Sequence, residues 1–427
     1  MKFKFLRLLG ALFAFALVAA ACGSDDDSSG PAHGDSLGDG SLGTVTVEAG
    51  EDIQIRSLNA ITGDVAFLGI PNQRGVEQAI ADFGDIHGFS VTIGTGLDDL
   101  CSADGGQAAA QTIVADESVV GVIGTSCSGA ATAASPLISA AGMVMISPSN
   151  TSPALTSDLA GTAGDNYHAG YYRTAHNDLF QGAAMAKFVY EDLGVSAAAA
   201  IHDGDPYTQG LAQAFADAFE GLGGTITGFT GVNKEDTDMV PVLTEIAAGS
   251  PGALFFPIFQ PAGDMVADQA PGVSGLEGTI LLGADGLQVQ SFMELPQADG
   301  MYLSGPDLRY GDNTNQSTGV TATQFLADYE SNNGNAPEAP FWAHSYDATT
   351  ILLEAIKAAA HVDGDDLVID RAGVREYLDN LSGYEGIIGT LSCDAFGDCG
   401  AARITVVQNN SADFQGSLEN VVFEFAP

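Results

Sequence analysis

Residues 121–136, with the sequence GVIGTSCSGAATAASP, place Cys127 between two serines in a glycine-containing segment. A serine nucleophile on a strand-to-helix turn needs the pattern G-x-S-x-G, and here Ser128 stands where the second glycine would be. A cysteine nucleophile needs a deprotonated thiol and a neighbouring imidazole, for which His176 and His202 are candidates. The alternative is a disulfide at the rim of a binding cleft. We favour the disulfide, because a thiol with a partner normally oxidises in an exported protein.

Other residues with catalytic or metal-binding potential form no recognisable motif. The 7 histidines are scattered, with neither an H-E-x-x-H motif nor a Cys/His cluster of zinc spacing. The glycine-rich turns lack the Gly-Lys-Ser/Thr ending of a phosphate-binding loop. Asp203 and Asp205 flank a glycine before Pro206, a composition typical of a turn. The sequence therefore predicts no enzyme activity, no metal and no cofactor.

Short β-rich runs alternate with longer amphipathic or alanine-rich segments from Asp52 onward. VVGVIGTS precedes GAATAASPLISAAG, and the alternation restarts after Tyr172 with AAAAIHD and TQGLAQAFADAFEGLG. Strands alternating with helices of this length predict βαβ units and parallel sheets. Ligands of open α/β sheets bind beyond the carboxyl ends of the strands. The candidate ligand-contacting segments are residues 126–128, 147–151, 202–207 and 258–260, together with Asp285.

The N-terminal segment has the features of an export signal. Residues 1–21 carry a basic head and an apolar run, and the AAAC that ends at Cys22 resembles a bacterial lipobox, in which the cysteine is lipidated. A simple secretory leader with a chance cysteine is the alternative. Residues 22–49 are predicted to be a flexible acidic tether rich in Gly, Ser and Asp, with the folded part starting near Thr44. We therefore expect an exported protein, lipid-anchored to the outer face of the cell membrane.

The net charge and the cysteine content indicate which partners this protein can bind and whether its cysteines are oxidised. Lys and Arg number 13 against 55 Asp and Glu, a formal net charge of −42. This charge disfavours nucleic-acid binding, because phosphates would be repelled. The four cysteines other than Cys22 are expected to pair under oxidising conditions. Cys393 and Cys399 surround the turn-rich DAFGD, which leaves Cys101 for Cys127, although spacing alone allows two other connectivities.

Several motifs follow one another from Asp52 to the C-terminus. They are NAITGDVAFLG, DDLCSADGGQAAAQTIV, the segment 119–156 around Cys127, YYRTAHNDLFQGAAMAKFV, IHDGDPYTQGLAQAF and FWAHSYDATTILLEAI. Together they resemble the type I periplasmic binding proteins of the leucine/isoleucine/valine-binding family, the receptor subunits of branched-chain amino-acid ABC importers.

The resemblance implies an α/β fold of two Rossmann-like lobes with parallel-sheet cores, joined by a three-crossover hinge near Thr174, Ser304 and Tyr384. Lobe 1 would comprise residues 50–174 and 305–384, and lobe 2 residues 175–304 and 385–427. In this family a disulfide joins the positions that match Cys101 and Cys127.

The resemblance also implies ligand contacts. Ser128 and Thr151 match residues that hold the ligand's carboxylate, and Ser149 matches a position whose backbone carbonyl accepts from its ammonium. From lobe 2, Tyr207 and Phe259 match aromatic residues that close over the ligand, and Asp285 matches an acidic residue that pairs with the ammonium.

Three positions depart from the family pattern. Leu68 stands where an aromatic residue often lines the pocket, Phe259 lacks a tyrosine hydroxyl, and Asp285 is one methylene shorter than glutamate. We expect a monomeric substrate-binding lipoprotein of an ABC importer, with permease subunits as partners. Its ligand would be a branched-chain or related amino acid, or an amide-like small molecule, held in the cleft between the lobes. The alternatives are a sensory ligand-binding protein without a transport role and, third, an exported hydrolase.

Overall fold

The computed structural model describes residues 36–426. The predicted signal peptide, the predicted lipidation site Cys22 and the tether as far as residue 35 lie outside the described residues. Among the residues described, no helix is both long enough and apolar enough to cross a membrane.

Lobe 1 is built on a parallel sheet with strand order β3-β2-β5-β6-β7, in which β4 also pairs with β2. Its strands are β2 (Ile53–Asn59), β3 (Val91–Thr92), β4 (Leu97–Asp98), β5 (Val119–Gly124), β6 (Val144–Ser147) and β7 (Tyr171–Arg173). Its helices are α1 (Ala66–Phe83), α2 (Ala103–Val114), α3 (Ser128–Ala140), α9 (Ala322–Asn333), α10 (Trp342–Ala359) and α11 (Arg371–Asp379).

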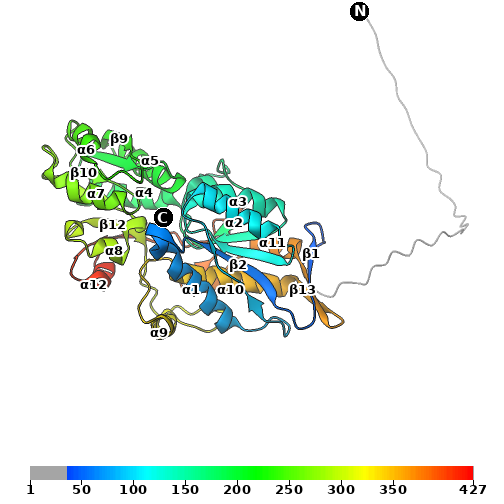
Figure 1. The fold of residues 1–427 in the computed structure, drawn as a ribbon. Helices are drawn as coiled ribbons and strands as arrows, with labels where there is room; N and C mark the ends of the chain where they lie inside the picture. The colour runs from blue at the N-terminus through cyan, green and yellow to red at the C-terminus, as the bar shows by residue number, and fades with distance from the viewer. Residues whose placement is uncertain (1–35, 427) are drawn as a thin grey trace, which may run out of the picture. The chain divides into compact units, whose positions relative to one another are not determined.

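Both faces of this sheet are buried. In β6, Val144 and Ile146 pack into the core beneath α1 and α10, whereas Met145 packs into the core beneath α2 and α3. Successive strand residues point to opposite faces, so a continuous apolar run supplies both cores. Figure 1 shows α2 and α3 on one side of the sheet and α1 and α10 on the other.

Lobe 2 contains a seven-stranded sheet of order β18-β17-β12-β11-β10-β8-β9, with β17 and β18 antiparallel. Its strands are β8 (Ala197–His202), β9 (Thr225–Gly231), β10 (Ala253–Phe255), β11 (Ile280–Gly283), β12 (Tyr302–Pro306), β17 (Ile404–Gln408) and β18 (Val421–Phe425). Its helices are α4 (Asp178–Lys187), α5 (Pro206–Gly221), α6 (Val240–Ala247), α7 (Ala262–Gln269), α8 (Gln290–Met293) and α12 (Phe414–Glu419).

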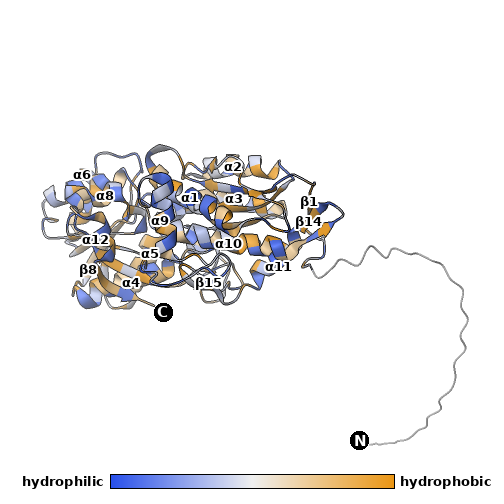
Figure 2. Ribbon diagram, turned by 90° about the horizontal axis from the view of Figure 1, so that it is seen from below, coloured by the Kyte–Doolittle hydropathy of each residue, from blue (hydrophilic) through white to orange (hydrophobic). Residues whose placement is uncertain are grey.

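In lobe 2, too, successive strand residues point alternately into two apolar cores, one on each face of the sheet. In β8, Ala198 and Ala200 contribute to the core with α4 and α5, whereas Ala199 and Ile201 contribute to the core with α6 and α7. The helices accordingly carry hydrophilic and hydrophobic stretches side by side, as amphipathic helices on a sheet do (Figure 2). The predicted parallel-sheet α/β architecture is confirmed.

The described chain packs on lobe 1 earlier than the predicted tether boundary at residue 49. Strand β1 (Thr44–Val47) pairs antiparallel with β14 (Asp366–Asp370), which also pairs with β13 (Ala360–Asp363). Val45 and Val47 are buried in the lobe 1 core. Residues 44–47 therefore belong to the fold, because their alternating valines supply a buried strand face that the polar composition around them obscures.

Three passages connect the lobes. Two fall near the predicted positions, after β7 at Thr174 and after β12 at Pro306. The third differs from the prediction at Tyr384. The hairpin β15 (Tyr384–Gly386) and β16 (Gly389–Leu391) places Ile387, Ile388 and Leu391 in the lobe 1 core, which also includes Cys399. The chain therefore enters lobe 2 between Cys399 and β17, because these apolar residues have their burial partners in lobe 1.

Candidate functional site

A small cavity lies at the carboxyl ends of strands from both sheets. The residues that line it are Leu68, Ser126, Cys127, Ser128, Ser149, Tyr207, Phe259, Asp285, Gly286 and Phe341. They include five of the six predicted ligand contacts, the exception being Thr151. The cavity measures about 20 Å³, which is room for about one water molecule. An amino acid could enter only if the surrounding side chains or lobes moved apart.

Lobe 1 supplies hydroxyl groups and a helix N-terminus. Ser128 is the first residue of α3 and follows β5 through a short turn, so its backbone N–H lies beside the cavity at the positive end of the helix. The N–H groups of Ala130 and Ala131 donate instead to the carbonyl oxygen of Cys127. The Ser149 hydroxyl donates to the carbonyl oxygen of Ser126 at 3.0 Å. The Ser149 hydroxyl therefore has its hydrogen engaged within lobe 1, and the start of α3 is the part of this wall that suits an anion such as a carboxylate.

Thr151 lies beneath the cavity wall. Its side chain is fully buried, and its carbonyl oxygen accepts from the backbone N–H of Asp178 at 2.9 Å. Because Thr151 is not among the lining residues, its predicted contact with a ligand carboxylate stays a prediction.

Lobe 2 supplies a carboxylate and two aromatic rings. The Asp285 side chain is buried, and its Oδ1 accepts from Tyr207 Oη at 3.0 Å and from Gln181 Nε2 at 2.7 Å. Burial raises the pKa of Asp285 to about 6, although the two hydrogen bonds act against the rise. The rings of Tyr207 and Phe259 lie 5.2 Å apart between centroids. The wall therefore combines an acid with apolar surface.

Gly286 keeps this wall compact. A Cβ at Gly286 would lie 3.0 Å from the Phe259 ring and 3.2 Å from Tyr207 Oη. Its backbone N–H donates to the same Tyr207 hydroxyl at 3.1 Å. Glycine therefore lets the turn after β11 approach both aromatic residues.

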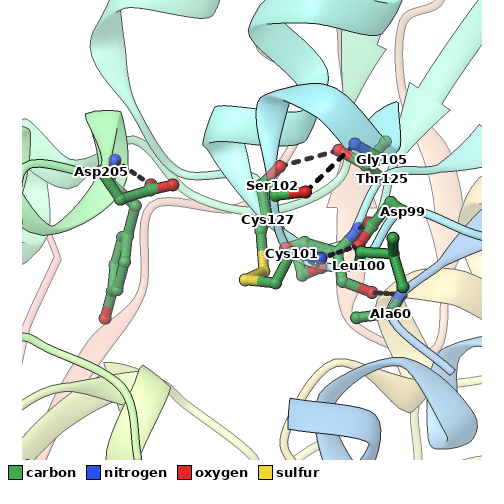
Figure 3. The surroundings of a disulfide bond; sticks show 12 residues. Ala60, Asp99, Leu100, Cys101, Ser102, Gly105, Thr125, Cys127 and Asp205 are labelled. Carbon is green, nitrogen blue, oxygen red and sulfur yellow. Dashed lines mark hydrogen bonds between the residues drawn. A yellow bond between two sulfur atoms is a disulfide. The ribbon is translucent and has the colours of Figure 1, made fainter. Parts of the chain in front are cut away.

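Cys127 is joined to Cys101 by a disulfide, with 5.0 Å between the Cα atoms. The buried carboxylate of Asp99 accepts from the backbone N–H of Cys101 at 2.7 Å (Figure 3). It also accepts from the backbone N–H of Ser126 at 2.7 Å and so ties the same two loops together. Burial raises the pKa of Asp99 to about 7. Cys127 therefore has no free thiol for nucleophilic catalysis. The second disulfide joins Cys393 to Cys399.

The lobes also meet directly, beside the cavity. Asp205 caps α5 by accepting from the Tyr207 N–H at 2.8 Å, and its second oxygen faces α3 across the lobes. A Cβ at Gly129 would lie 2.3 Å from Asp205 Oδ2. Figure 3 shows Asp205 approaching from a different segment than the disulfide. Burial raises the pKa of Asp205 to about 6. Glycine at position 129 therefore permits the observed separation of the lobes.

An outer cleft of about 710 Å³ shares Phe259 with the cavity and also draws its lining from both lobes. Its wall carries Asp64, Asp203, Asp205 and Glu235 against one cation, Lys234. This cleft offers a route by which a small molecule could reach the inner cavity from solvent.

Sequence reasoning missed one wall of the cavity. Phe341 precedes Trp342, the first residue of α10, and is buried with its ring 5.0 Å from that of His344. The available signal was the aromatic pair Phe341 and Trp342 at the start of a long apolar helix. The sequence does not say which of the two faces the cavity and which packs in the core. Among residues 36–426, no group of three or more His, Cys, Asp or Glu side chains is arranged to hold a metal ion.

Comparisons with known proteins agree with this geometry. The family model for periplasmic binding proteins matches residues 52–410. The leucine-specific-binding protein of Salmonella typhimurium is 28% identical over 363 residues, which cover 84% of this chain and 91% of that protein.

Two solved structures share the fold. The leucine-binding protein from Thermotoga maritima has a TM-score of 0.72 at 24% identity, covering 88% of this chain and 99% of that one. A branched-chain amino acid transporter substrate-binding protein from Streptococcus pneumoniae, solved in complex with isoleucine, has a TM-score of 0.69 at 21% identity, covering 88% and 99%.

Two lobes with a cavity between them, together with a family match over most of the chain, define a substrate-binding protein and not an enzyme. The chain belongs to the periplasmic binding protein family. Membership of this family places it outside the cytoplasm.

Proposed function

We propose that this protein is the receptor subunit of an ABC importer and binds an amino acid with an apolar side chain in the cavity between its lobes. The observation that carries the proposal is the composition of one cavity. The N-terminus of α3 and the buried carboxylate of Asp285 line the same small space, and aromatic and aliphatic side chains fill the rest of its wall. An amino acid offers the matching set of an anion, a cation and an apolar side chain.

In this proposal different residues contact the carboxylate and the ammonium of the ligand. The hydroxyl and the backbone N–H of Ser128 hold the ligand's carboxylate, because a helix N-terminus favours an anion. The backbone carbonyl of Ser149 and Asp285 take the ammonium, because a buried cation needs a charged partner to offset its desolvation. Gln181 and Tyr207 both donate to Oδ1 of Asp285, which leaves Oδ2 as the oxygen available to the ligand.

The side chain of the ligand would contact the apolar residues of the wall, which are Leu68, Tyr207, Phe259 and Phe341. Thr151 would reach the carboxylate only after the cavity widens. Names of relatives support the ligand class, since the matched proteins include a leucine-specific-binding protein and a Leu/Ile/Val-binding protein. Those relatives also favour the importer over the sensory alternative.

A thermal-shift series with three probes tests the ligand class. L-leucine carries both charged groups, isocaproate lacks the ammonium, and isoamylamine lacks the carboxylate. A probe at about one hundred times its Kd adds about 2.7 kcal/mol to the free energy of unfolding, enough to raise the Tm by a few degrees. We expect a shift with L-leucine only. A Tm shift with isocaproate and not with L-leucine would contradict the role of Asp285. The absence of a Tm shift with all three probes would contradict the ligand class.

Lipid anchoring is the second part of the proposal and rests on the sequence around Cys22. Metabolic labelling with a fatty-acid analogue should mark the full-length protein and not its Cys22→Ala variant. Size-exclusion chromatography of the domain starting at Ser36 should give a monomer.

A further inference from the structure

Arg173, at the end of the strand β7 that leads out of lobe 1, holds the loop that carries two of the proposed ligand contacts. The residue is fully buried. Its Nη1 donates to the carbonyl oxygen of Asn150 at 3.2 Å and to that of Ser152 at 2.8 Å. One guanidinium nitrogen therefore forms hydrogen bonds with the backbone on both sides of Thr151.

The same loop is coupled to the start of α3. The backbone N–H of Ser152 donates to the hydroxyl oxygen of Ser128 at 3.4 Å. A displacement of residues 149–152 would therefore change the surroundings of Ser128 as well as those of Ser149 and Thr151.

Arg173 is held in turn by Asp398, a residue distant in sequence. The Nε atom of Arg173 pairs with Asp398 Oδ1, and Asn177 Nδ2 donates to Asp398 Oδ2 at 3.2 Å. Leaving a buried guanidinium without its carboxylate is costly, because the cation cannot recover its hydration in place. The position of the guanidinium therefore depends on Asp398.

Asp398 lies in the seven-residue loop that the Cys393–Cys399 disulfide closes. This loop extends the edge of the lobe 1 sheet through two backbone hydrogen bonds. The N–H of Arg173 donates to the carbonyl oxygen of Gly397 at 2.9 Å, and the N–H of Cys399 donates to the carbonyl oxygen of Arg173 at 3.0 Å. Gly397 has φ of +82°, and a Cβ there would lie 2.2 Å from the carbonyl oxygen of Tyr171. The loop is thus fitted closely against β7.

We propose that Asp398 is a positioning residue for ligand binding: through Arg173 it fixes the loop Ser149–Ser152, and the Cys393–Cys399 disulfide fixes Asp398. The inference rests on the proposed function, since it assigns a supporting structure to the same site. The disulfide loop is thereby a component of the binding site, although none of its residues lines the cavity.

Hydrogen exchange of the ligand-free protein tests this inference without any ligand. The variants are Asp398→Asn, which removes the charge, and the double variant Cys393→Ser with Cys399→Ser, which keeps both charged side chains but opens the loop. The matched control is Asp347→Asn. Asp347 is another buried carboxylate of lobe 1, and it accepts from the N–H groups of Ile387 and Ile388 without contacting residues 149–152.

We expect faster exchange at the amides of Asn150 and Ser152 in both test variants, measured relative to the amides of α5. Thr156 should respond in the same way, because its hydroxyl oxygen accepts from Arg173 Nη2 at 2.7 Å. The control should leave this ratio unchanged. Equal ratios in all three variants, or no change in the test variants, would overturn the inference. If Asp398→Asn fails to fold, the double cysteine variant still decides the question.

Titration with L-leucine provides the second measurement. A hydrogen bond to a charged group is worth enough that its loss should weaken L-leucine binding roughly tenfold or more in Asp398→Asn. If the unaltered protein does not bind L-leucine, the proposed ligand fails, and the exchange experiment still decides the role of Asp398. Unaltered affinity in a variant whose loop exchanges faster would show that the loop position does not matter for binding and would overturn the inference.

Discussion

Asp285 should limit the stability of the ligand-free protein, because folding buries its carboxyl group. Burial raises the pKa of Asp285 from 3.8 to about 6. The folded state therefore binds this proton more tightly than the unfolded chain does. Stability falls as the pH rises from about 4 to about 6 and stays at the lower level above that range. At about 1.4 kcal/mol for each tenfold change in proton affinity, the penalty at neutral pH is about 3 kcal/mol.

The variant Asp285→Asn should remove this penalty. Asparagine keeps an acceptor oxygen for Gln181 and Tyr207 but carries no charge that burial could penalise. We expect the ligand-free variant to be more stable than the unaltered protein by up to about 3 kcal/mol at neutral pH. The gain should shrink toward zero near pH 4, where the carboxyl group is largely protonated in the folded state.

Urea unfolding at several pH values between about 4 and about 7 measures the effect. The matched control is Asp347→Asn, because burial also raises the pKa of Asp347 to about 6. Asp347 accepts from two backbone N–H groups, which a single amide oxygen cannot replace fully, so this variant should be destabilised. An Asp285→Asn variant that gains no stability at neutral pH, or gains equally at all pH values, would refute the reasoning.

Three further predictions concern the cavity and its rim. Gly129→Ala places a Cβ 2.3 Å from Asp205 Oδ2. Small-angle scattering should therefore show a larger radius of gyration and titration a weaker affinity for L-leucine, whereas Gly221→Ala, with no atom within 4 Å of its Cβ, should change neither. Replacing Cys101 and Cys127 by serine should lower the free energy of unfolding by about 3 kcal/mol in denaturant titrations, and an unchanged value would contradict a stabilising disulfide. Phe341→Ala should cost about 3 kcal/mol and enlarge the cavity, which a crystal structure of the variant can check.

The general architecture was predictable from the sequence because its signals are local. Continuous apolar strands such as β5 and β6 can be read as buried on both faces, and each is followed by small polar residues at the carboxyl end. Those residues, together with Tyr207, Phe259 and Asp285, were named from motif order and five of the six proposed contacts line one cavity. Thr151 was named with them and lies beneath the wall, so its contact with a ligand stays a prediction, because a motif specifies a position in the chain and not the direction of a side chain.

The third passage between the lobes was predicted too early for a similar reason. Ile387, Ile388 and Leu391 are apolar residues in a short hairpin, and nothing in their spacing says which lobe will bury them. The predicted tether, residues 22–49, overlapped the predicted start of the fold near Thr44, because glycine and acidic residues surround the strand Thr44–Val47. That strand pairs with one more than three hundred residues away. Pairing over such distances depends on the assembled fold.

The sequence by itself determined the alternation of strands and helices, the absence of a catalytic motif and the residues that follow each strand, which are properties of composition, periodicity and local spacing. The class of protein came from the resemblance of its ordered motifs to a known family. Only the tertiary structure decided that Phe341 completes the cavity, that Gly129 admits Asp205 from the other lobe, and that Asp398 reaches Arg173 beneath the ligand loop. Such contacts join residues far apart in the chain, and close packing of the folded lobes alone brings their atoms together.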